Sequence, residues 1–243
     1  MVTSSQAETR LIAMLIDGDN AQPSLLQQIL PEVARYGVIT TRRIYGDWTT
    51  PNMSGWKDSL QTHAVQPVQQ FRWTTGKNAT DSALIIDAMD LLHSGTVSGF
   101  CIVSSDSDYT RLATRIREQG MFVMGVGRSD TPKSFVNACE VFVYTENLAP
   151  EPEPAPKPKQ PAAVGDWVTT AVQAIESASQ DDGWAFLGAV GTYLRKLDPA
   201  FDPRTYGHKQ LSLLIKSHPD RFEMRETKSK TGPSVMYVRV TSG

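Results

Sequence analysis

The stretch LIAMLIDGDN, residues 11–20, is a continuous apolar run that ends in two aspartates separated by one glycine. An apolar run of this length between polar flanks predicts a buried strand of a parallel sheet. Its last residues then lie at the carboxyl edge of the sheet, where α/β proteins bind ligands. Because carboxylates lose solvation there, Asp17 and Asp19 need a cation or hydrogen-bond donors. The alternative is that Asp19 or Asn20 only caps a helix that begins near Pro23.

The segments that follow alternate between strand-like and helix-like patterns. Further strands are expected at residues 38–45, 65–73, 99–103, 121–126 and 141–144, and helices at residues 23–36, 56–63, 81–92, 109–119 and 132–139. Alternation at this spacing predicts an α/β fold in which helices cover both faces of a Rossmann-like parallel sheet. We expect residues 1–148 to form this first domain.

A proline-rich segment divides the chain. Residues 149–163 alternate proline with charged residues, and proline neither continues a helix nor pairs in a central sheet. We interpret this segment as an extended, semi-rigid linker. Beyond it, residues 164–243 contain helix-like segments and then two alternating strands around residues 228–232, which predict a small winged helix-turn-helix domain. The helices are expected at residues 168–178, 184–197 and 207–216, and the strands at residues 222–225 and 235–240.

Further aspartates stand at comparable places in the first domain. The run SSDSD, residues 104–108, follows the expected fourth strand, and Asp81 begins a helix. Each aspartate could cap its helix, but capping does not account for four aspartates at two strand ends. If the two strands are neighbours where the strand order reverses, four carboxylates converge at one edge of the sheet. They belong to Asp17, Asp19, Asp106 and Asp108.

This grouping of carboxylates favours a metal site. Carboxylates that lie so close together cannot all ionise without a cation. Hard oxygen ligands with no nearby histidine or cysteine select Mg²⁺ or Mn²⁺ over Zn²⁺. Such a site can generate hydroxide and stabilise in-line displacement at phosphorus. The sequence therefore indicates phosphodiester chemistry at this edge.

Basic and aromatic side chains accompany the acidic groups. The basic residues are Arg42 and Arg43 in the second expected strand, Arg72 in the third, Lys77 in the next loop, and Arg128 and Lys133 after the fifth. They are expected to hold a polyanion, and three tryptophans near some of them could stack bases. Those tryptophans are Trp48, Trp56 and Trp73. The alternative for each single residue is surface charge or core packing.

Composition limits the class of protein. The chain has 243 residues, 40% of them hydrophobic, and a formal net charge of -2, so its overall charge predicts no polyanion partner. Cys101 and Cys139 lie in apolar surroundings, which predicts buried thiols in a reducing cytosol. Residues 1–10 lack the apolar stretch of a signal peptide, and no run approaches the ~20 apolar residues that cross a membrane. We expect a cytoplasmic protein with no membrane partner.

Three stretches carry a joint pattern: LIDGDN at residues 15–20, GKNATD at 76–81 running on to IDAM at 86–89, and VSSDSDY at 103–109. Together they resemble the NYN domain of the PIN-like nuclease superfamily, particularly its bacterial LabA-like branch. The resemblance covers nearly all of residues 10–148. It implies a Rossmann-like sheet and metal-dependent cleavage of RNA, although some relatives with this fold bind RNA without cutting it.

The resemblance also implies roles for individual residues. By position, the family's acidic metal site matches Asp17, Asp81, Asp106 and Asp108, with Asn20 beside it on the substrate side. We expect these four aspartates to be catalytic and, together with Asp19, to hold the metal. The sequence departs from the family at two places: Ser105 stands where glycine is frequent, and Tyr109 stands where phenylalanine is common.

The second domain carries a looser resemblance. The run WAFLG at residues 184–188, the pair YG at 206–207, Leu211, Phe222 and Tyr237 look like an OST-HTH/LOTUS domain. That family implies RNA binding or protein docking. Several basic residues could contact phosphates, and the alternative is a solvated charged face on a protein-docking module. These residues are Lys209, Lys216, Arg225, Lys228 and Lys230.

Our hypothesis is a ribonuclease that depends on Mg²⁺ or Mn²⁺ and carries a C-terminal RNA-recruiting domain. One alternative is an RNA-binding regulator without catalysis. Another is a haloacid-dehalogenase-like phosphatase, whose nucleophile and acid/base pair would be Asp17 and Asp19. Against the phosphatase, Asn20 replaces the glycine that usually follows the second aspartate.

Overall fold

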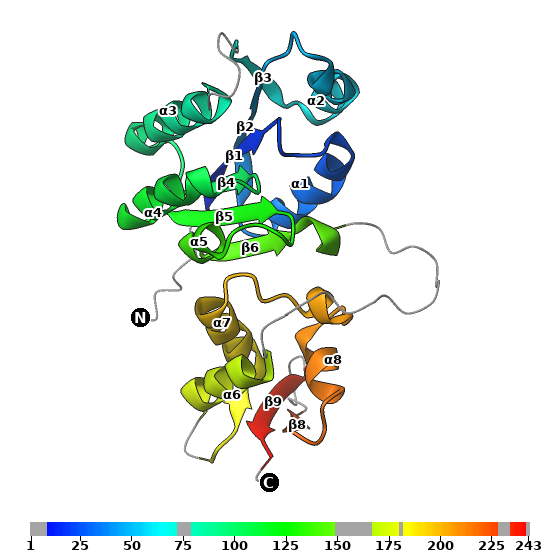
Figure 1. Cartoon of the computed structure of the whole chain (residues 1–243). Helices are drawn as coiled ribbons and strands as arrows, with labels where there is room; N and C mark the ends of the chain where they lie inside the picture. Colours follow the sequence, from blue (N-terminus) through cyan, green and yellow to red (C-terminus); the bar gives the residue numbers. More distant parts are fainter. Residues whose placement is uncertain (1–8, 72–78, 149–166, 180–181, 228–233, 242–243) are drawn as a thin grey trace, which may run out of the picture. The chain divides into compact units, whose positions relative to one another are not determined.

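A computed structural model describes residues 9–71, 79–148, 167–179, 182–227 and 234–241 of the chain. The chain divides into two compact units, residues 1–149 and residues 150–243 (Figure 1). The predicted linker, residues 149–163, lies outside the described residues. No helix of the described ranges is long and apolar enough to cross a membrane.

The first unit contains a six-stranded parallel sheet in the order β3-β2-β1-β4-β5-β6. Its strands are β1 Leu11–Asp17, β2 Val38–Gly46, β3 Gln66–Gln69, β4 Gly99–Val103, β5 Phe122–Gly127 and β6 Val141–Tyr144. The chain runs outward from β1 to β3, then returns to place β4 on the other side of β1. The strand order therefore reverses between β1 and β4, which is where open α/β sheets bind ligands.

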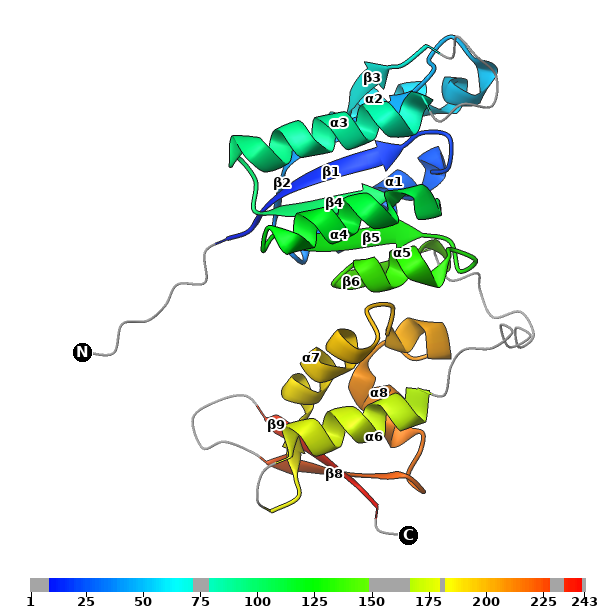
Figure 2. The ribbon, with the colours of Figure 1, turned by 60° about the vertical axis from the view of Figure 1, so that its left-hand side comes forward.

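Helices cover both faces of this sheet. They are α1 Leu26–Ala34, α2 Lys57–His63, α3 Ala79–Ser94, α4 Thr110–Glu118 and α5 Lys133–Ala138, with 3-10 turns η1 Pro23–Leu25, η2 Pro51–Trp56, η3 Ser107–Tyr109 and η4 Thr145–Asn147. Helices α3 and α4 lie on one face and α1 on the opposite face (Figures 1 and 2). The predicted α/β fold class is confirmed.

The alternation along β1 shows how the sequence builds this layering. Ile12, Met14 and Ile16 belong to the core cluster that includes Leu26 and Ile29 of the α1 side. The intervening residues of β1 are buried as well, because a central parallel strand is covered on both faces. Asp17, the last residue of β1, is also buried, at the carboxyl end of this strand.

Within its described residues, the second unit combines three α-helices with a small antiparallel sheet in the order β7-β9-β8. Its elements are α6 Trp167–Ala178, β7 Ala185–Phe186, α7 Leu187–Leu197, the 3-10 turn η5 Pro203–Tyr206, α8 Leu211–Lys216, β8 Phe222–Thr227 and β9 Val235–Val240. Trp167 anchors the core, where its ring contacts those of Phe201, Tyr206 and Phe222. Helices followed by a hairpin match the predicted winged helix-turn-helix arrangement.

Two predicted helices of this unit start later than expected. The prediction of a helix from residue 184 is wrong for Ala185 and Phe186, which pair with Val238 and Tyr237 as strand β7. The prediction of a helix from residue 207 is wrong in its first turn, because Gly207 has φ +79 and closes the turn η5. Left-handed backbone at that glycine cannot continue a helix.

The predicted third strand is also too long. Strand β3 covers Gln66–Gln69, whereas the apolar pattern predicted a strand to residue 73. Only the edge of the sheet is available to this segment, where it pairs with β2 alone. The last residue of β2, Gly46, pairs with Gln69, so β2 offers no further residue with which β3 could pair. Residues 72 and 73 lie outside the described ranges.

Candidate metal centre

Asp17 is fully buried at the end of β1. Its carboxylate accepts hydrogen bonds from Asn20 Nδ2 at 2.7 Å, from Ser104 Oγ at 2.8 Å and from the Asp19 amide at 3.1 Å. Burial raises the pKa of Asp17, and these three donors oppose the rise. Donors from β1's own loop and from the end of β4 therefore replace the lost solvent.

The glycine between the two first aspartates makes this turn possible. The Gly18 amide donates to the carbonyl of Tyr45 at 2.9 Å. A Cβ on Gly18 would lie 2.7 Å from that carbonyl oxygen and 2.6 Å from Cε of Met53. Because the first of these atoms belongs to a strand backbone that cannot move freely, a side chain at residue 18 would displace Asp17.

Three carboxylates meet beside Asp17. One oxygen each of Asp81, Asp106 and Asp108 lies within 4.8 Å of the others. Asp81 is in the first turn of α3, whereas Asp106 caps η3 and Asp108 lies inside it. Helix α3 and η3 lie in contact, and that contact brings together side chains that are 25 residues apart in the chain (106 minus 81).

Ser104 links the buried aspartate to this cluster. Its hydroxyl donates to Asp17, and the same oxygen accepts a hydrogen bond from the Asp106 amide at 3.1 Å. Asp106 Oδ1 in turn accepts from the Asp108 amide at 2.9 Å. The loop after β4 is thereby held by a chain of hydrogen bonds that begins at the end of β1.

Asp81 is held from the side of η3. The buried hydroxyl of Tyr109 donates to Asp81 Oδ1 at 2.8 Å. Burial raises the pKa of the Asp81 carboxyl, and the neighbouring charges of Asp17, Asp106 and Asp108 raise it further. Desolvation is the larger of these two causes, and the neighbouring carboxylates add negative charge that disfavours ionisation of Asp81.

The donor set fits a hard divalent cation. The cluster consists of carboxylate oxygens, and within the described residues it includes neither histidine nor cysteine. Oxygen ligands of this kind suit Mg²⁺, Mn²⁺ or Ca²⁺ and not Zn²⁺. A bound cation would also relieve the repulsion that raises the pKa of Asp81. In the part of the chain that the structure describes, Asp17 and the exposed Asp19 stay outside the three-residue cluster.

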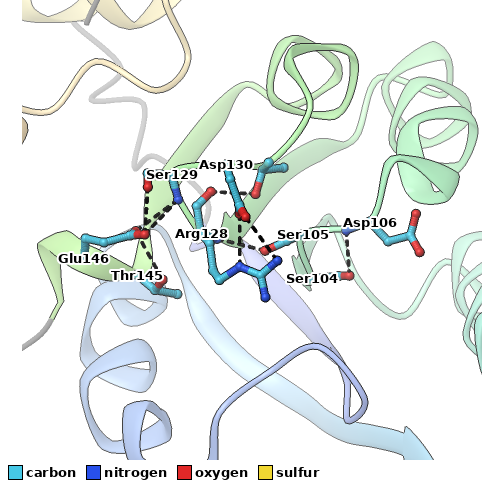
Figure 3. A network of polar contacts seen from close by, with 9 residues as sticks. Ser104, Ser105, Asp106, Arg128, Ser129, Asp130, Thr145 and Glu146 are labelled. Atoms are coloured by element: carbon cyan, nitrogen blue, oxygen red, sulfur yellow. Dashed lines mark hydrogen bonds and ion pairs between the residues drawn. The ribbon is translucent and has the colours of Figure 1, made fainter. Parts of the chain in front are cut away.

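The loop after β5 is fixed next to the loop after β4 (Figure 3). The Arg128 amide donates to Ser105 Oγ at 2.8 Å, so the serine that departs from the family pattern joins the two loops. The amide and hydroxyl of Ser129 both donate to Glu146 Oε1 at 2.9 Å. In Figure 3 the carboxyl group of Asp106 is directed away from the Arg128 guanidinium.

The predicted substrate-binding residues occupy different surroundings. Arg128 pairs with Asp130 at 3.0 Å, and 48% of its side chain is exposed. Lys133 is exposed at the start of α5, and Lys209 is exposed between η5 and α8. Arg128 and Lys133 thus follow β5 at the same edge as the cluster. Four further predicted residues lie outside the described ranges: Arg72, Lys77, Lys228 and Lys230.

The two arginines of β2 contact protein groups. Arg42 donates to the carbonyl of His63 at 2.9 Å. Arg43 donates to Asp87 Oδ1, and the Tyr45 hydroxyl donates to Asp87 Oδ2. The Arg42 contact ties β2 to the end of α2, and the two contacts with Asp87 tie β2 to α3.

Sequence reasoning missed three contributors. Tyr109 carried a signal, since a hydroxyl stands where phenylalanine is common in the family. Glu146 and the pairing of Asp87 carried none, because each depends on a partner at least 17 residues away in the chain. Such pairs form only in the tertiary structure, where strands and loops that are distant in the chain lie next to one another.

Comparison with known families gives two matches. The model described as NYN domain matches residues 11–146, and the model described as OST-HTH/LOTUS domain matches residues 166–233. Both agree with the resemblances seen in the sequence. Comparison with curated proteins gives no match.

Solved structures include similar chains. A crystal structure of a protein of unknown function from Vibrio parahaemolyticus is 16% identical, with a TM-score of 0.48, and the match covers 57% of this chain and 94% of that one. An uncharacterised protein from Nitrosomonas europaea, solved by NMR, is 36% identical with a TM-score of 0.32, covering 39% and 89%. An NMR structure of a protein segment from Chromobacterium violaceum is 35% identical with a TM-score of 0.26, covering 34% and 84%.

Proposed function

Because the chain belongs to the NYN domain family, we propose that it is a metal-dependent ribonuclease that hydrolyses phosphodiester bonds of RNA. NYN domains are PIN-like nucleases, and OST-HTH domains bind RNA. The observation that carries the proposal is the cluster of Asp81, Asp106 and Asp108 at the point where the strand order reverses. The cofactor we propose is Mg²⁺ or Mn²⁺.

Each residue of the site has a distinct task in this proposal. Asp81, Asp106 and Asp108 would hold the cation, which when bound supplies Lewis-acid polarisation of the phosphate and a lowered pKa for water. Tyr109 orients Asp81 through its hydroxyl. Asp17 orients the loop that carries Asp106, because Ser104 bonds to both residues. A carboxylate oxygen not used for the cation can orient the attacking water.

Substrate would cross the same edge of the sheet. Arg128 and Lys133 place positive charge after β5, where they can contact phosphates on one side of the cluster. The exposed Asp130 holds Arg128 while no phosphate is present, and an exposed ion pair of this kind is weak enough to exchange partners. Asn20, which donates to Asp17 Oδ2 at 2.7 Å, would lie next to the path of the substrate.

The second domain would recruit RNA to this edge. Lys209 is exposed and would contact phosphates in this role. The proline-rich segment at residues 149–163 tethers the domain, and a tether raises the effective concentration of RNA bound at one domain for the other. Loss of the second domain should therefore lower the affinity for RNA more than it lowers the rate of bond cleavage.

One observation favours a second candidate, an RNA-binding regulator without turnover. Asp17 is fully buried, and hydrogen bonds from Asn20, Ser104 and the Asp19 amide engage its carboxylate. A position that the family resemblance implies as a metal ligand thus contacts three protein donors. The same burial disfavours the phosphatase alternative, because a phosphoryl acceptor must meet its substrate.

The test is a cleavage assay with matched variants. End-labelled single-stranded and hairpin RNAs are incubated with the full chain in Mn²⁺, Mg²⁺ or EDTA. We expect metal-dependent fragments from the wild type and from Asp90→Asn, an exposed aspartate on the same helix as Asp81. Asp81→Asn and Asp106→Asn should lower the rate at least about 100-fold, as expected when a catalytic metal is lost, with unfolding temperatures recorded for all.

Two results would overturn the ribonuclease. Equal cleavage by folded Asp106→Asn and wild-type protein would assign the fragments to another nuclease in the preparation. Tight RNA binding with no fragments in either metal would establish the regulator in its place.

A further inference from the structure

One side of the second sheet carries aromatic and guanidinium groups together. The strand register sets Arg225 opposite Tyr237, and Tyr237 opposite Phe186. Residues directly opposite in an antiparallel pair share one face, and Arg239, two residues after Tyr237, shares it as well. Trp184 joins them through ring contacts with both arginines. We call Trp184, Phe186, Arg225, Tyr237 and Arg239 the stacking face.

The two arginines are spread over aromatic rings. The guanidinium carbon of Arg225 lies 4.5 Å from the ring centroid of Trp184 and 5.4 Å from that of Tyr237. The guanidinium carbon of Arg239 lies 4.7 Å from the Trp184 centroid. Cation–π contacts hold both side chains in place, yet 47% of Arg225 and 45% of Arg239 remain exposed. Their charges are therefore pre-positioned and open to solvent.

Phe186 adds an open ring to the same face. It is 45% exposed although it lies in a strand, and its centroid is 6.2 Å from that of Tyr237. A Cβ on Gly188 would come within 2.6 Å of the Phe186 ring, so the absence of a side chain there lets the ring rest against the start of α7. Its position is thereby defined while its outer surface stays free to contact a ligand.

We propose that the stacking face binds single-stranded RNA, with bases stacked on Phe186 and Tyr237 and phosphates held by Arg225 and Arg239. Unstacked bases offer flat π surfaces to aromatic rings and guanidinium planes, whereas the bases of a duplex are covered by their neighbours. The inference rests on the proposed function, in which RNA is the substrate. It adds the conformation of the RNA and the surface that holds it.

The ion pairs on this face are compatible with phosphate binding. Arg239 bonds to Glu223 at 2.6 Å, and Arg225 lies 3.6 Å from Asp182. The two carboxylate side chains are 50% and 54% exposed, and exposed ion pairs contribute little in water. A phosphate can therefore take the place of either carboxylate. This competition predicts binding that weakens as salt concentration rises.

The experiment measures RNA binding by the full chain in EDTA, so that binding is independent of cleavage. Fluorescence anisotropy is recorded with a labelled 12-nucleotide single strand and with the corresponding duplex. The variants are Phe186→Ala, Phe186→Tyr and Arg239→Gln. The control is Arg221→Gln. Like Arg239, Arg221 is exposed, at 67%, and has a carboxylate partner, an aspartate at 3.6 Å. It does not belong to the stacking face but lines a cleft with Val168 and Gln173 of α6.

We expect Phe186→Ala and Arg239→Gln each to weaken single-strand binding by about 5- to 10-fold, as loss of one stacked base or one phosphate contact would. Phe186→Tyr keeps the ring and should bind as the wild type does. Arg239→Gln should also lower the salt dependence by about 0.7 in the slope of log affinity against log salt. Arg221→Gln should stay within about twofold of the wild type, and duplex binding should be weaker throughout.

Several results would overturn the inference. The first is unchanged RNA affinity in both Phe186→Ala and Arg239→Gln, which would leave this face to a protein partner. The second is an equal loss of RNA affinity in Arg221→Gln. The third is tighter binding of the duplex than of the single strand. Unfolding temperatures exclude loss by misfolding, and Phe186→Tyr provides the rescue. If RNA is cleaved with metal while the variants bind normally, only this inference fails. If the variants lose binding and no metal supports cleavage, the ribonuclease fails and this inference stands.

Discussion

The hydroxyl of Tyr109 donates a hydrogen bond of 2.8 Å to Asp81 Oδ1, and the Tyr109 ring is fully buried behind it. Burial and the negative charges of Asp17 and Asp81 raise the pKa of Tyr109 far above its ordinary range, so the hydroxyl keeps its proton. Tyr109 is thus a permanent donor that restrains one oxygen of Asp81. A phenylalanine there would fill the same space without holding the carboxylate.

The first prediction concerns this hydrogen bond. Tyr109→Phe should stay folded and should weaken Mn²⁺ binding and cleavage by about tenfold, since a hydrogen bond to a charged group contributes about 1.5–3 kcal/mol. Isothermal titration with Mn²⁺ and steady-state cleavage kinetics measure the two effects. If Tyr109→Phe binds Mn²⁺ and cleaves RNA as the wild type does, Asp81 needs no orienting donor.

The second prediction concerns the stability that a cation adds. Saturating Mn²⁺ or Mg²⁺ should raise the unfolding temperature of the first domain, because a ligand that binds only the folded state stabilises that state. At a metal concentration of 100 times Kd, the gain in the free energy of unfolding is about 2.7 kcal/mol. Asp108→Asn removes one of the three clustered carboxylates and should abolish most of the shift. Differential scanning calorimetry in metal and in EDTA provides the comparison. An equal shift in wild type and Asp108→Asn would place the binding elsewhere.

The third prediction is a pH dependence at Glu146. Although partial burial alone raises its pKa, hydrogen bonds from Ser129 lower the pKa of Glu146 below its ordinary 4.5. A lowered folded-state pKa adds stability that is present above pH 4.5 and lost as pH falls through the folded value. Glu146→Gln should therefore lower stability at pH 7, by less than about 1 kcal/mol for an exposed group.

The difference between wild type and Glu146→Gln should shrink as pH falls below 4.5, because protonation removes the charge that the hydrogen bonds from Ser129 stabilise. Urea unfolding at pH 7 and pH 3.5 tests the sign. A difference that grows as pH falls would contradict the assignment of Ser129 as the donor that lowers this pKa.

The fourth prediction separates structure from substrate binding at Arg43. Arg43 pairs with Asp87 while both side chains are mostly buried, at 27% and 25% exposed. Arg43→Met should lower the free energy of unfolding by about 1–3 kcal/mol, because Asp87 loses a charged partner. RNA affinity, measured at a temperature where the variant is folded, should change little. Unchanged stability with weaker RNA binding would support the contact role expected from the sequence.

Much of the fold follows from local pattern. The apolar run that ends at Asp17, the alternation of strands and helices, and strand β4 at Gly99–Val103 are features of short segments, and each is found where the sequence places it. Residues 185–186 are different, because strand β7 exists only through its pairing with β9. A two-residue strand has no periodicity of its own, so helix propensity decides the prediction until the partner is known.

The candidate site divides in the same way. The motifs predict Asp81, Asp106 and Asp108 as metal ligands, and the structure brings these three carboxylates together. Asp17 also belongs to one of the acidic motifs. In the fold, Ser104, Asn20 and the Asp19 amide donate hydrogen bonds to its carboxylate. Which side chains contact a given carboxylate depends on which loops lie next to it, and that is a tertiary property.

The sequence by itself determined the strand–helix alternation, the three acidic motifs and the resemblance to two families, because hydrophobic period and motif spacing are written within short segments. The tertiary structure decided which carboxylates meet, that Tyr109 holds Asp81, that Arg43 pairs with Asp87, and that aromatic and guanidinium groups gather on the second sheet. These relations join residues distant in the chain, and strand order and packing alone bring them within contact distance.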